Sequence, residues 1–214
     1  MGECWKWTNA AQQTLGRSPP SSFEWGEGVS HTVVPWRGAL CEPGVIHCCD
    51  DPILAVMMDP AHVQYSSGGG LLWLCEWSGR TVAAADKRGV ETLRTLHVVA
   101  PPVLMTEQRV EIGLRAVLVV LSAARRWADG AGRGDVLASL DVVAAWAARW
   151  LDGADRSAGA AASTRDAAFA VGEAAGAAVS AADAAGMAAD AAGRAGIPLD
   201  LVAICREVAR GNKR

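Results

Sequence analysis

The chain lacks the features that mark membrane proteins and general nucleic-acid binders. No uncharged apolar stretch reaches the about 18 residues that a membrane-spanning helix needs. The net charge is −3, and outside the C-terminal tail no run of basic residues exceeds a pair such as Arg125–Arg126. The first residues, MGECWKW, show no basic region followed by an apolar core. We therefore expect a cytoplasmic protein with no signal peptide, no membrane contact and no nucleic-acid partner.

The specific spacing of a zinc site is also absent. The sequence has six cysteines and four histidines, yet it contains no Cys-x-x-Cys pair. Cysteines without a secretory signal stay reduced in the cytosol, so we expect buried thiols and no bound metal or cofactor. Three other interpretations stay open. They are a zinc site formed by Cys41, His47, Cys48 or Cys49, and Cys75, a cysteine nucleophile with His47, and a redox disulfide between Cys48 and Cys49.

Composition changes sharply near residue 103. Eight of nine prolines, six of nine tryptophans, five of six cysteines and all four histidines precede this point, and alanine dominates after it. Pro101-Pro102 is incompatible with a helix interior or a central strand. We predict an α+β domain over residues 1–103, with a ligand cleft, and a helical domain over residues 104–214.

The second half predicts helices over 106–128 and 135–151, and a short last helix that begins at Pro198. Between them, alanines recur at spacings of three and four residues over 164–195. Such a seam of methyl groups lets a second helix approach closely. Its partner is either the first two helices or the same helix of another copy, and the second alternative makes the protein a homo-oligomer.

The first half predicts short strands at residues 4–8, 22–25, 31–34, 44–48, 71–77 and 92–99. In LLWLCEW (residues 71–77), both alternating sets of side chains are mainly apolar, which is typical of a central strand and leaves Glu76 partly buried. Asp50 or Asp51 caps a short helix over 52–58, with Pro52 in its first turn. The predicted fold class is α+β, with a small mixed or antiparallel sheet followed by an alanine-rich helical bundle.

Several segments together resemble a family of uncharacterised phage and bacterial proteins. They are EWGEGVSHT, LCEPGVIHCCDDPILAVMMDPAHV, LWLCEWSG, DKRGVETLRTLHVVAPPVLMTEQRVEIGL and WAARWLDGADRSAGAAA. That family has a small N-terminal domain of unknown function, of roughly the Cys-x-x-Gly-x-His-x-Cys-x-x-Pro type, and a variable alanine-rich helical tail. The resemblance implies a phage or mobile-element origin and brings no catalytic residues.

A fainter likeness concerns the ADP-ribosyltransferase fold. The predicted order of strand 44–48, helix 52–58, glycine-rich loop, strand 71–77 and Gly79 is similar to the second half of that fold. The likeness implies a nucleotide-shaped cleft, and an enzyme of this type would use Glu76 or Glu91 to polarise the ribose of NAD.

The expected function is that of a non-enzymatic binding protein. Aromatic faces stack on bases and arginines pair with phosphates, so a tryptophan-rich domain suits a nucleotide signal of a host defence system. Alternatively, the protein blocks a host defence protein directly. The two other functions are an ADP-ribosyltransferase-like enzyme and a structural or accessory phage protein. We expect no catalytic set, and the predicted ligand-binding residues are His47, Tyr65, Trp73, Glu76, Arg80 and Arg94.

Overall fold

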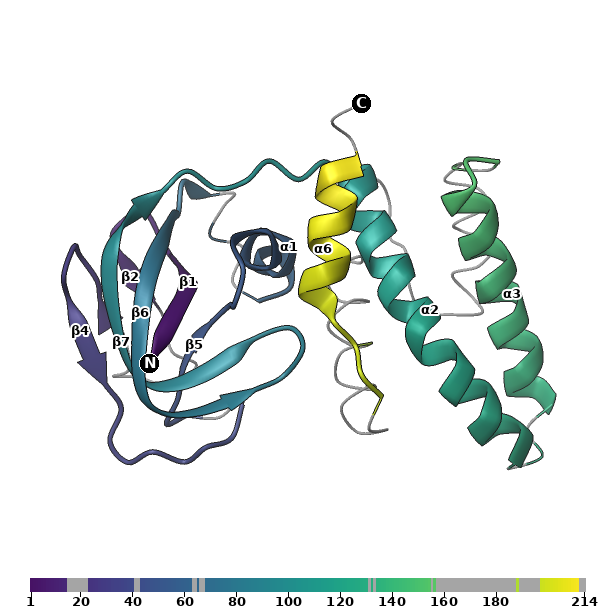
Figure 1. Cartoon of the computed structure of the whole chain (residues 1–214), viewed down its shortest axis with the longest axis horizontal. Helices are drawn as coiled ribbons and strands as arrows, with labels where there is room; N and C mark the ends of the chain where they lie inside the picture. The colour runs from purple at the N-terminus through teal and green to yellow at the C-terminus, as the bar shows by residue number, and fades with distance from the viewer. Residues whose placement is uncertain are drawn as a thin grey trace. The chain divides into compact units, whose positions relative to one another are not determined.

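A computed structural model shows an α+β protein whose chain divides into two compact units, Met1–Leu104 and Met105–Arg214 (Figure 1). It describes residues 1–14, 23–40, 43–62, 65, 68–130, 132, 134–154, 156, 188 and 197–211. Among these residues, no helix combines the length and the apolar character that crossing a membrane requires.

The first unit is built on an antiparallel sheet of five strands. Strand β6 is central, with β1 on one side and β7 on the other, and β7 pairs with both β4 and β5 along its second edge. A separate two-stranded sheet joins β2 to β3. The strands are β1 (Gly2–Thr8), β2 (Gln13–Thr14), β3 (Phe23–Glu24), β4 (Ser30–Thr32), β5 (Ile46–Cys48), β6 (Leu71–Ala83) and β7 (Arg88–Val99).

The large sheet closes on itself between its first strand and the end of β5. Trp5 pairs with Cys49 in antiparallel fashion, and two backbone N–H···O bonds of 2.8 Å each join them. Since β1 also pairs with β6, the strands β1, β6, β7 and β5 form a closed circuit, which we call the strand ring. The pairing of Trp5 with Cys49 is the seam of this ring.

The β6–β7 hairpin is longer than predicted. Strands over 71–77 and 92–99 are confirmed, but β6 continues to Ala83 and β7 begins at Arg88. A tight turn with a bond of 2.9 Å from the N–H of Ala84 to the carbonyl oxygen of Lys87 joins them. The prediction ended β6 too early because Gly79, which resembles a strand terminator, lies within the hairpin.

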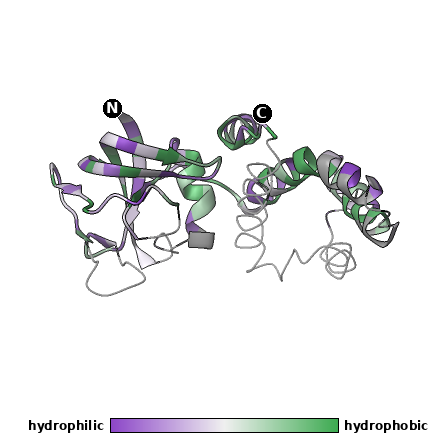
Figure 2. Ribbon diagram, turned by 90° about the horizontal axis from the view of Figure 1, so that it is seen from below, coloured by the Kyte–Doolittle hydropathy of each residue, from purple (hydrophilic) through white to green (hydrophobic). Residues whose placement is uncertain are grey.

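The predicted short helix is present as α1 (Pro52–His62). Its cap is Asp51, whose Oδ1 accepts bonds of 2.7 Å and 3.3 Å from the N–H groups of Ile53 and Leu54. As predicted, Leu54, Val56, Met57 and Met58 are buried. Figure 2 shows α1 as mainly hydrophobic beside strands of alternating character. The Trp7 Nε1–H donates to the Ala55 carbonyl oxygen at 3.0 Å, which fixes α1 against β1.

The second unit contains α2 (Thr106–Gly130), α3 (Gly134–Leu151) and α6 (Leu201–Gly211). The helices α2 and α3 run side by side and bury a shared cluster of Leu114, Trp146, Ala147 and Trp150 (Figure 1). Asp200 caps α6 by accepting a 2.8 Å bond from the N–H of Ala203, so this helix begins three residues later than predicted. The predicted alanine seam over 164–195 lies outside the described residues, apart from Ala188.

Candidate functional site

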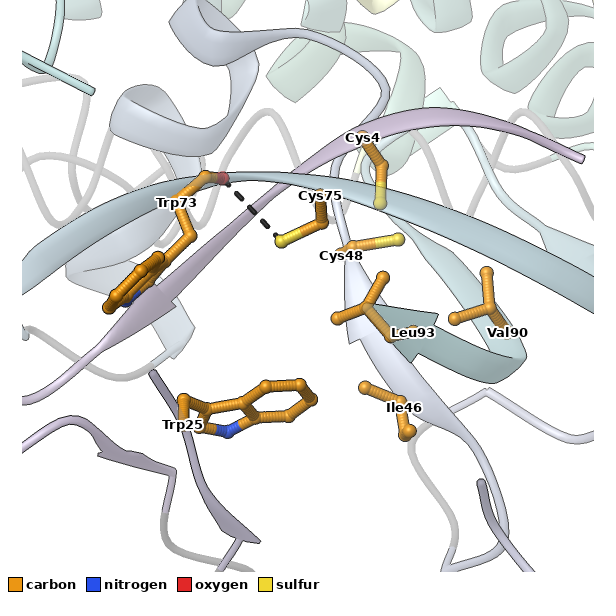
Figure 3. Packing of buried hydrophobic residues seen from close by; sticks show 8 residues of the cluster. All are labelled: Cys4, Trp25, Ile46, Cys48, Trp73, Cys75, Val90 and Leu93. Atoms are coloured by element: carbon orange, nitrogen blue, oxygen red, sulfur yellow. Dashed lines mark hydrogen bonds between the residues drawn. The ribbon is translucent and has the colours of Figure 1, made fainter. Parts of the chain in front are cut away.

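The interior of the strand ring is lined by side chains from all four of its strands (Figure 3). Alternation along β1 directs Cys4, Lys6 and Thr8 to the same face, and all three are buried. The core cluster consists of Cys4, Trp25, Ile46, Cys48, Trp73, Cys75, Val90 and Leu93. Among the described residues, the interior is therefore mainly apolar, and its polar members include the thiols, Thr8, Thr95 and Lys6.

Three thiols from three strands meet in this interior. Cys4 lies directly opposite Cys75 in the β1–β6 pairing. Figure 3 shows its sulfur near those of Cys48 and Cys75, and the Cys75 thiol donates to the Trp73 carbonyl oxygen at 3.7 Å. All three are free thiols. The hydrogen bonds with Cys48 and Cys75, followed by burial, raise the pKa of Cys4 far above its ordinary value. In the closed ring the Cys4 thiol therefore stays protonated and reacts poorly as a nucleophile.

Lys6 is a buried cation beside the thiols. Its Nζ donates to the carbonyl oxygen of His47 at 3.0 Å and lies 5.3 Å from the centroid of the Trp25 ring. Burial lowers the pKa of Lys6, and the electrostatic influence of the neighbouring thiols, of which Cys48 is the strongest, acts in the opposite direction. The contact with the Trp25 ring compensates part of the lost hydration of the ammonium group.

In the part of the chain that the structure describes, no group of three or more His, Cys, Asp or Glu side chains is arranged to hold a metal ion. Cys48 and Cys49 point to opposite faces, as predicted: Cys48 is in the core, while the Cys49 thiol donates to the Asp86 carbonyl oxygen at 3.9 Å. Cys41 lies outside the described residues.

A β-bulge interrupts β6 on the outer side of the ring. The register with β7 shifts between Ser78 and Thr81, and Gly79 adopts a positive φ of 79°. A Cβ atom at this position would lie 2.6 Å from Oε2 of Glu91, so the close approach also favours glycine. The bulge directs the N–H of Arg80 to the same Oε2 atom at 2.9 Å. Bulges of this kind commonly re-aim a side chain.

The side chain of Arg80 is fixed on the surface by two neighbours. Its Nε and Nη2 donate to Oε1 of Glu91 at 3.1 Å and 2.5 Å, and its guanidinium lies 5.6 Å from the centroid of the Trp36 ring. The side chain of Arg80 is nevertheless 61% exposed. The hydrogen bonds from Arg80 lower the pKa of Glu91 and raise that of Arg80. We call Arg80, Glu91 and Trp36 the bulge site.

A second arginine of the same hairpin has a similar environment. Arg88 donates from Nε and Nη2 to the two carboxylate oxygens of Asp50 at 2.6 Å and 2.8 Å, and it lies 5.1 Å from the Trp77 ring centroid. Its Nη1 donates to Thr81 Oγ1 at 3.2 Å. The side chain of Arg88 donates to three acceptor atoms and that of Arg80 to one, so Arg88 is held more completely than Arg80.

The six predicted ligand-binding residues do not converge on one place. Arg80 belongs to the bulge site, whereas Trp73 is 3% exposed in the ring interior and donates to Thr8 Oγ1 at 3.1 Å. His47 is partly buried on β5, and Tyr65 follows α1, where its N–H donates to Asp59 Oδ1 at 2.9 Å.

Glu76 and Arg94 are exposed and lie opposite each other on β6 and β7. The prediction of a partly buried Glu76 is wrong. Glu3 and Arg94, its partners in the two neighbouring strands, are exposed as well, so this face of the sheet is open to solvent at Glu76.

Sequence reasoning did not identify Trp36, Asp50 or Lys6 as members of a site. Trp36 and Asp50 meet their arginines through contacts between distant segments, which no local pattern indicates. The burial of Lys6 could have been predicted, because Lys6 occupies an inward position in the alternation of CWKWT. Comparison of the chain with protein-family models, curated proteins and solved structures found no match in any of the three.

Proposed function

We propose that the first unit is a non-enzymatic binding module for a small nucleotide-type ligand, and that Arg80 anchors this ligand. The observation that carries the proposal is an exposed guanidinium that is already oriented by Glu91 and stacked on Trp36. Orienting an arginine before binding reduces the entropy that a ligand must overcome.

The donors and the ring plane of the bulge site suit two parts of a nucleotide. The bonds described for the Arg80 side chain use Nε and Nη2, which leaves Nη1 to donate to a phosphate. The indole of Trp36 and the guanidinium plane together provide a flat surface on which a base can stack. The ligand must compete with Glu91, so a group with more negative charge than a carboxylate is favoured.

If the protein has the phage origin that its sequence resemblance implies, binding a nucleotide signal would serve the phage against a host defence. In a host cytoplasm, a protein that binds a nucleotide signal without consuming it lowers the concentration of the signal and blunts the defence that depends on it. Assembly of several copies through the alanine-rich segment over 164–195 would increase the number of binding sites per particle.

Isothermal titration of the full chain tests the proposal. The ligands are adenosine and guanosine mono- and triphosphates, cyclic dinucleotides and NAD. We expect Arg80→Met to weaken the binding of the preferred nucleotide by about 10- to 100-fold, the range for loss of a hydrogen bond to a charged group. Arg125→Met is the matched control, since Arg125 is an exposed arginine paired with Asp141 in the second unit.

Three results would contradict the proposal. They are unchanged affinity in Arg80→Met, equal losses in both variants, and no binding of any nucleotide at concentrations of about 1 mM. NAD is also monitored for consumption: turnover that Glu76→Gln or Glu91→Gln abolishes would favour the enzyme of ADP-ribosyltransferase type instead. Native mass spectrometry of the same preparation gives the copy number and shows any nucleotide retained from the cell.

A further inference from the structure

The seam of the strand ring is its weakest junction. Along the other edge of β1, seven consecutive residues pair with β6. At the seam, the hydrogen bonds are the two between Trp5 and Cys49 and the one from Lys6 Nζ to the His47 carbonyl oxygen. Beyond it, the bond from Trp7 Nε1 holds α1, which follows β5. Junctions with few backbone hydrogen bonds open most often in native proteins. Opening of the ring therefore begins with separation of β5 from β1.

The thiol cluster lies directly behind this seam. Cys4 precedes Trp5, and Cys48 precedes Cys49, so the seam residues carry two of the three thiols on neighbouring positions. The third thiol, Cys75, belongs to β6 and faces Cys4 across the seven-residue pairing. Separation at the seam exposes Cys4 while Cys75 remains beside it.

We propose that Cys4, Cys48 and Cys75 form an oxidisable site, at which a peroxide produces a Cys4–Cys75 disulfide when the seam opens. The Cys4 thiolate attacks one peroxide oxygen, the O–O bond breaks, and the leaving hydroxide is protonated to water. Cys4 is then a sulfenic acid. The sulfur of Cys75, after losing its proton, attacks the Cys4 sulfur, the S–O bond breaks, and a second water leaves. The two thiols lose two electrons, and the peroxide accepts them.

The register explains why Cys75 is the partner of Cys4. Residues directly opposite in an antiparallel pair have Cβ atoms about 4.5–5.5 Å apart, and a disulfide needs about 3.5–4.5 Å, so a small adjustment is sufficient. The antiparallel pairing of Trp5 with Cys49 places Lys6, not Cys4, opposite Cys48. In addition, Cys48 moves away with β5 when the seam opens.

The closed ring protects the site. Burial and thiol–thiol hydrogen bonds raise the pKa of Cys4, so its reactive thiolate is scarce until water enters. Oxidation therefore requires an open seam and an oxidant at the same time. The disulfide joins β1 covalently to β6 and does not prevent β5 from separating from β1.

The test uses the wild-type full chain. The protein is treated with hydrogen peroxide in sub-denaturing urea, the remaining thiols are alkylated, and peptides are mapped by mass spectrometry without reduction. We expect a peptide pair linked through Cys4 and Cys75 that has lost two hydrogen atoms, and a rate of formation that rises with urea. Cys48→Ala is expected to form the same link, and Cys4→Ala to lose it.

Other products would overturn the proposal. Two of these are other disulfides, Cys4–Cys48 and Cys48–Cys49. The third is that Cys4 and Cys75 stay free thiols in molecules whose Cys49 or Cys205 has been oxidised. A rate that is independent of urea would show that opening of the seam does not control the reaction. Because the decisive mapping uses the wild type, a variant that fails to fold does not weaken the test.

Discussion

The ring interior and the bulge site both place a cation against a tryptophan ring, but the first pair is buried and the second is exposed to solvent. Lys6 lies 5.3 Å from the Trp25 ring centroid and is 8% exposed. Arg80 lies 5.6 Å from the Trp36 ring centroid, and its side chain is 61% exposed. Inside the ring, the surroundings of the cation change the pKa of Lys6 and the stability of the fold. On the surface, the same kind of contact mainly orients the side chain of Arg80 for recognition.

The energetics follow from this difference. Removing an ammonium group from water is costly, so Lys6 has a lowered pKa although it keeps a hydrogen bond and a ring contact. The pair formed by Arg80 and Glu91 remains in water, where ion pairs contribute little to folding. We therefore expect substitutions in the interior to change stability, and substitutions in the bulge site to change local geometry and binding.

The largest expected effect comes from truncation in the ring interior. Leu93 is 0% exposed and belongs to the core cluster, so Leu93→Ala should lower the free energy of unfolding by about 2–5 kcal/mol. Val98→Ala on the same strand is the matched control, because Val98 is 44% exposed and should change stability by about 0.5 kcal/mol or less. Urea denaturation measures both variants, and equal losses would show that the interior is not the main core.

The next effect concerns the pH dependence contributed by Lys6. With its pKa lowered in the folded state, the unfolded chain binds more protons between that pKa and about 10.4, so the stability contributed by this group rises with pH in this window. The difference in unfolding free energy, wild type minus Lys6→Met, should rise by about 1.4 kcal/mol per unit of pKa lowering. Cysteine titrations occur in both proteins and largely cancel. A flat or falling difference would contradict a buried, destabilised ammonium group.

The smallest of the three effects is expected at the bulge. Gly79→Ala forces a side chain into a left-handed backbone conformation and against Glu91, which should cost about 1–2 kcal/mol. Gly68→Ala is the control, because a Cβ atom there has no neighbour within 4 Å. Thermal unfolding compares the two variants. If both behave alike, the bulge is more adaptable than its geometry indicates.

Local features of the fold were predictable from the sequence. The capping of α1, the two faces of residues 71–77 and the extents of α2 and α3 each depend on neighbours within one or two turns or on simple alternation. Such patterns reflect propensities and periodicities that a single segment carries. The α+β class follows from these elements.

The candidate sites could not be predicted, because they are formed by contacts between segments that are far apart in the sequence. Closure of the ring joins Trp5 to Cys49, and the bulge site joins Arg80 to Trp36 across a long connection. Among the predicted ligand residues, Trp73 is buried in the core. An inward tryptophan on a central strand has the same sequence pattern whether it lines a ligand site or fills a core. Only the three-dimensional pairing of strands separates the two cases.

Closure of the ring has a consequence for the newborn chain. The ribosome makes β1 first, but its partners in β5 and β6 follow only after tens of residues. At about 5–20 residues per second, Cys4 and Lys6 spend several seconds in water before their neighbours exist. The hairpin of β6 and β7 is local and can form as soon as it emerges. The first strand of the sheet to be made is thus exposed to solvent until β6 has been made, and so is the thiol of Cys4.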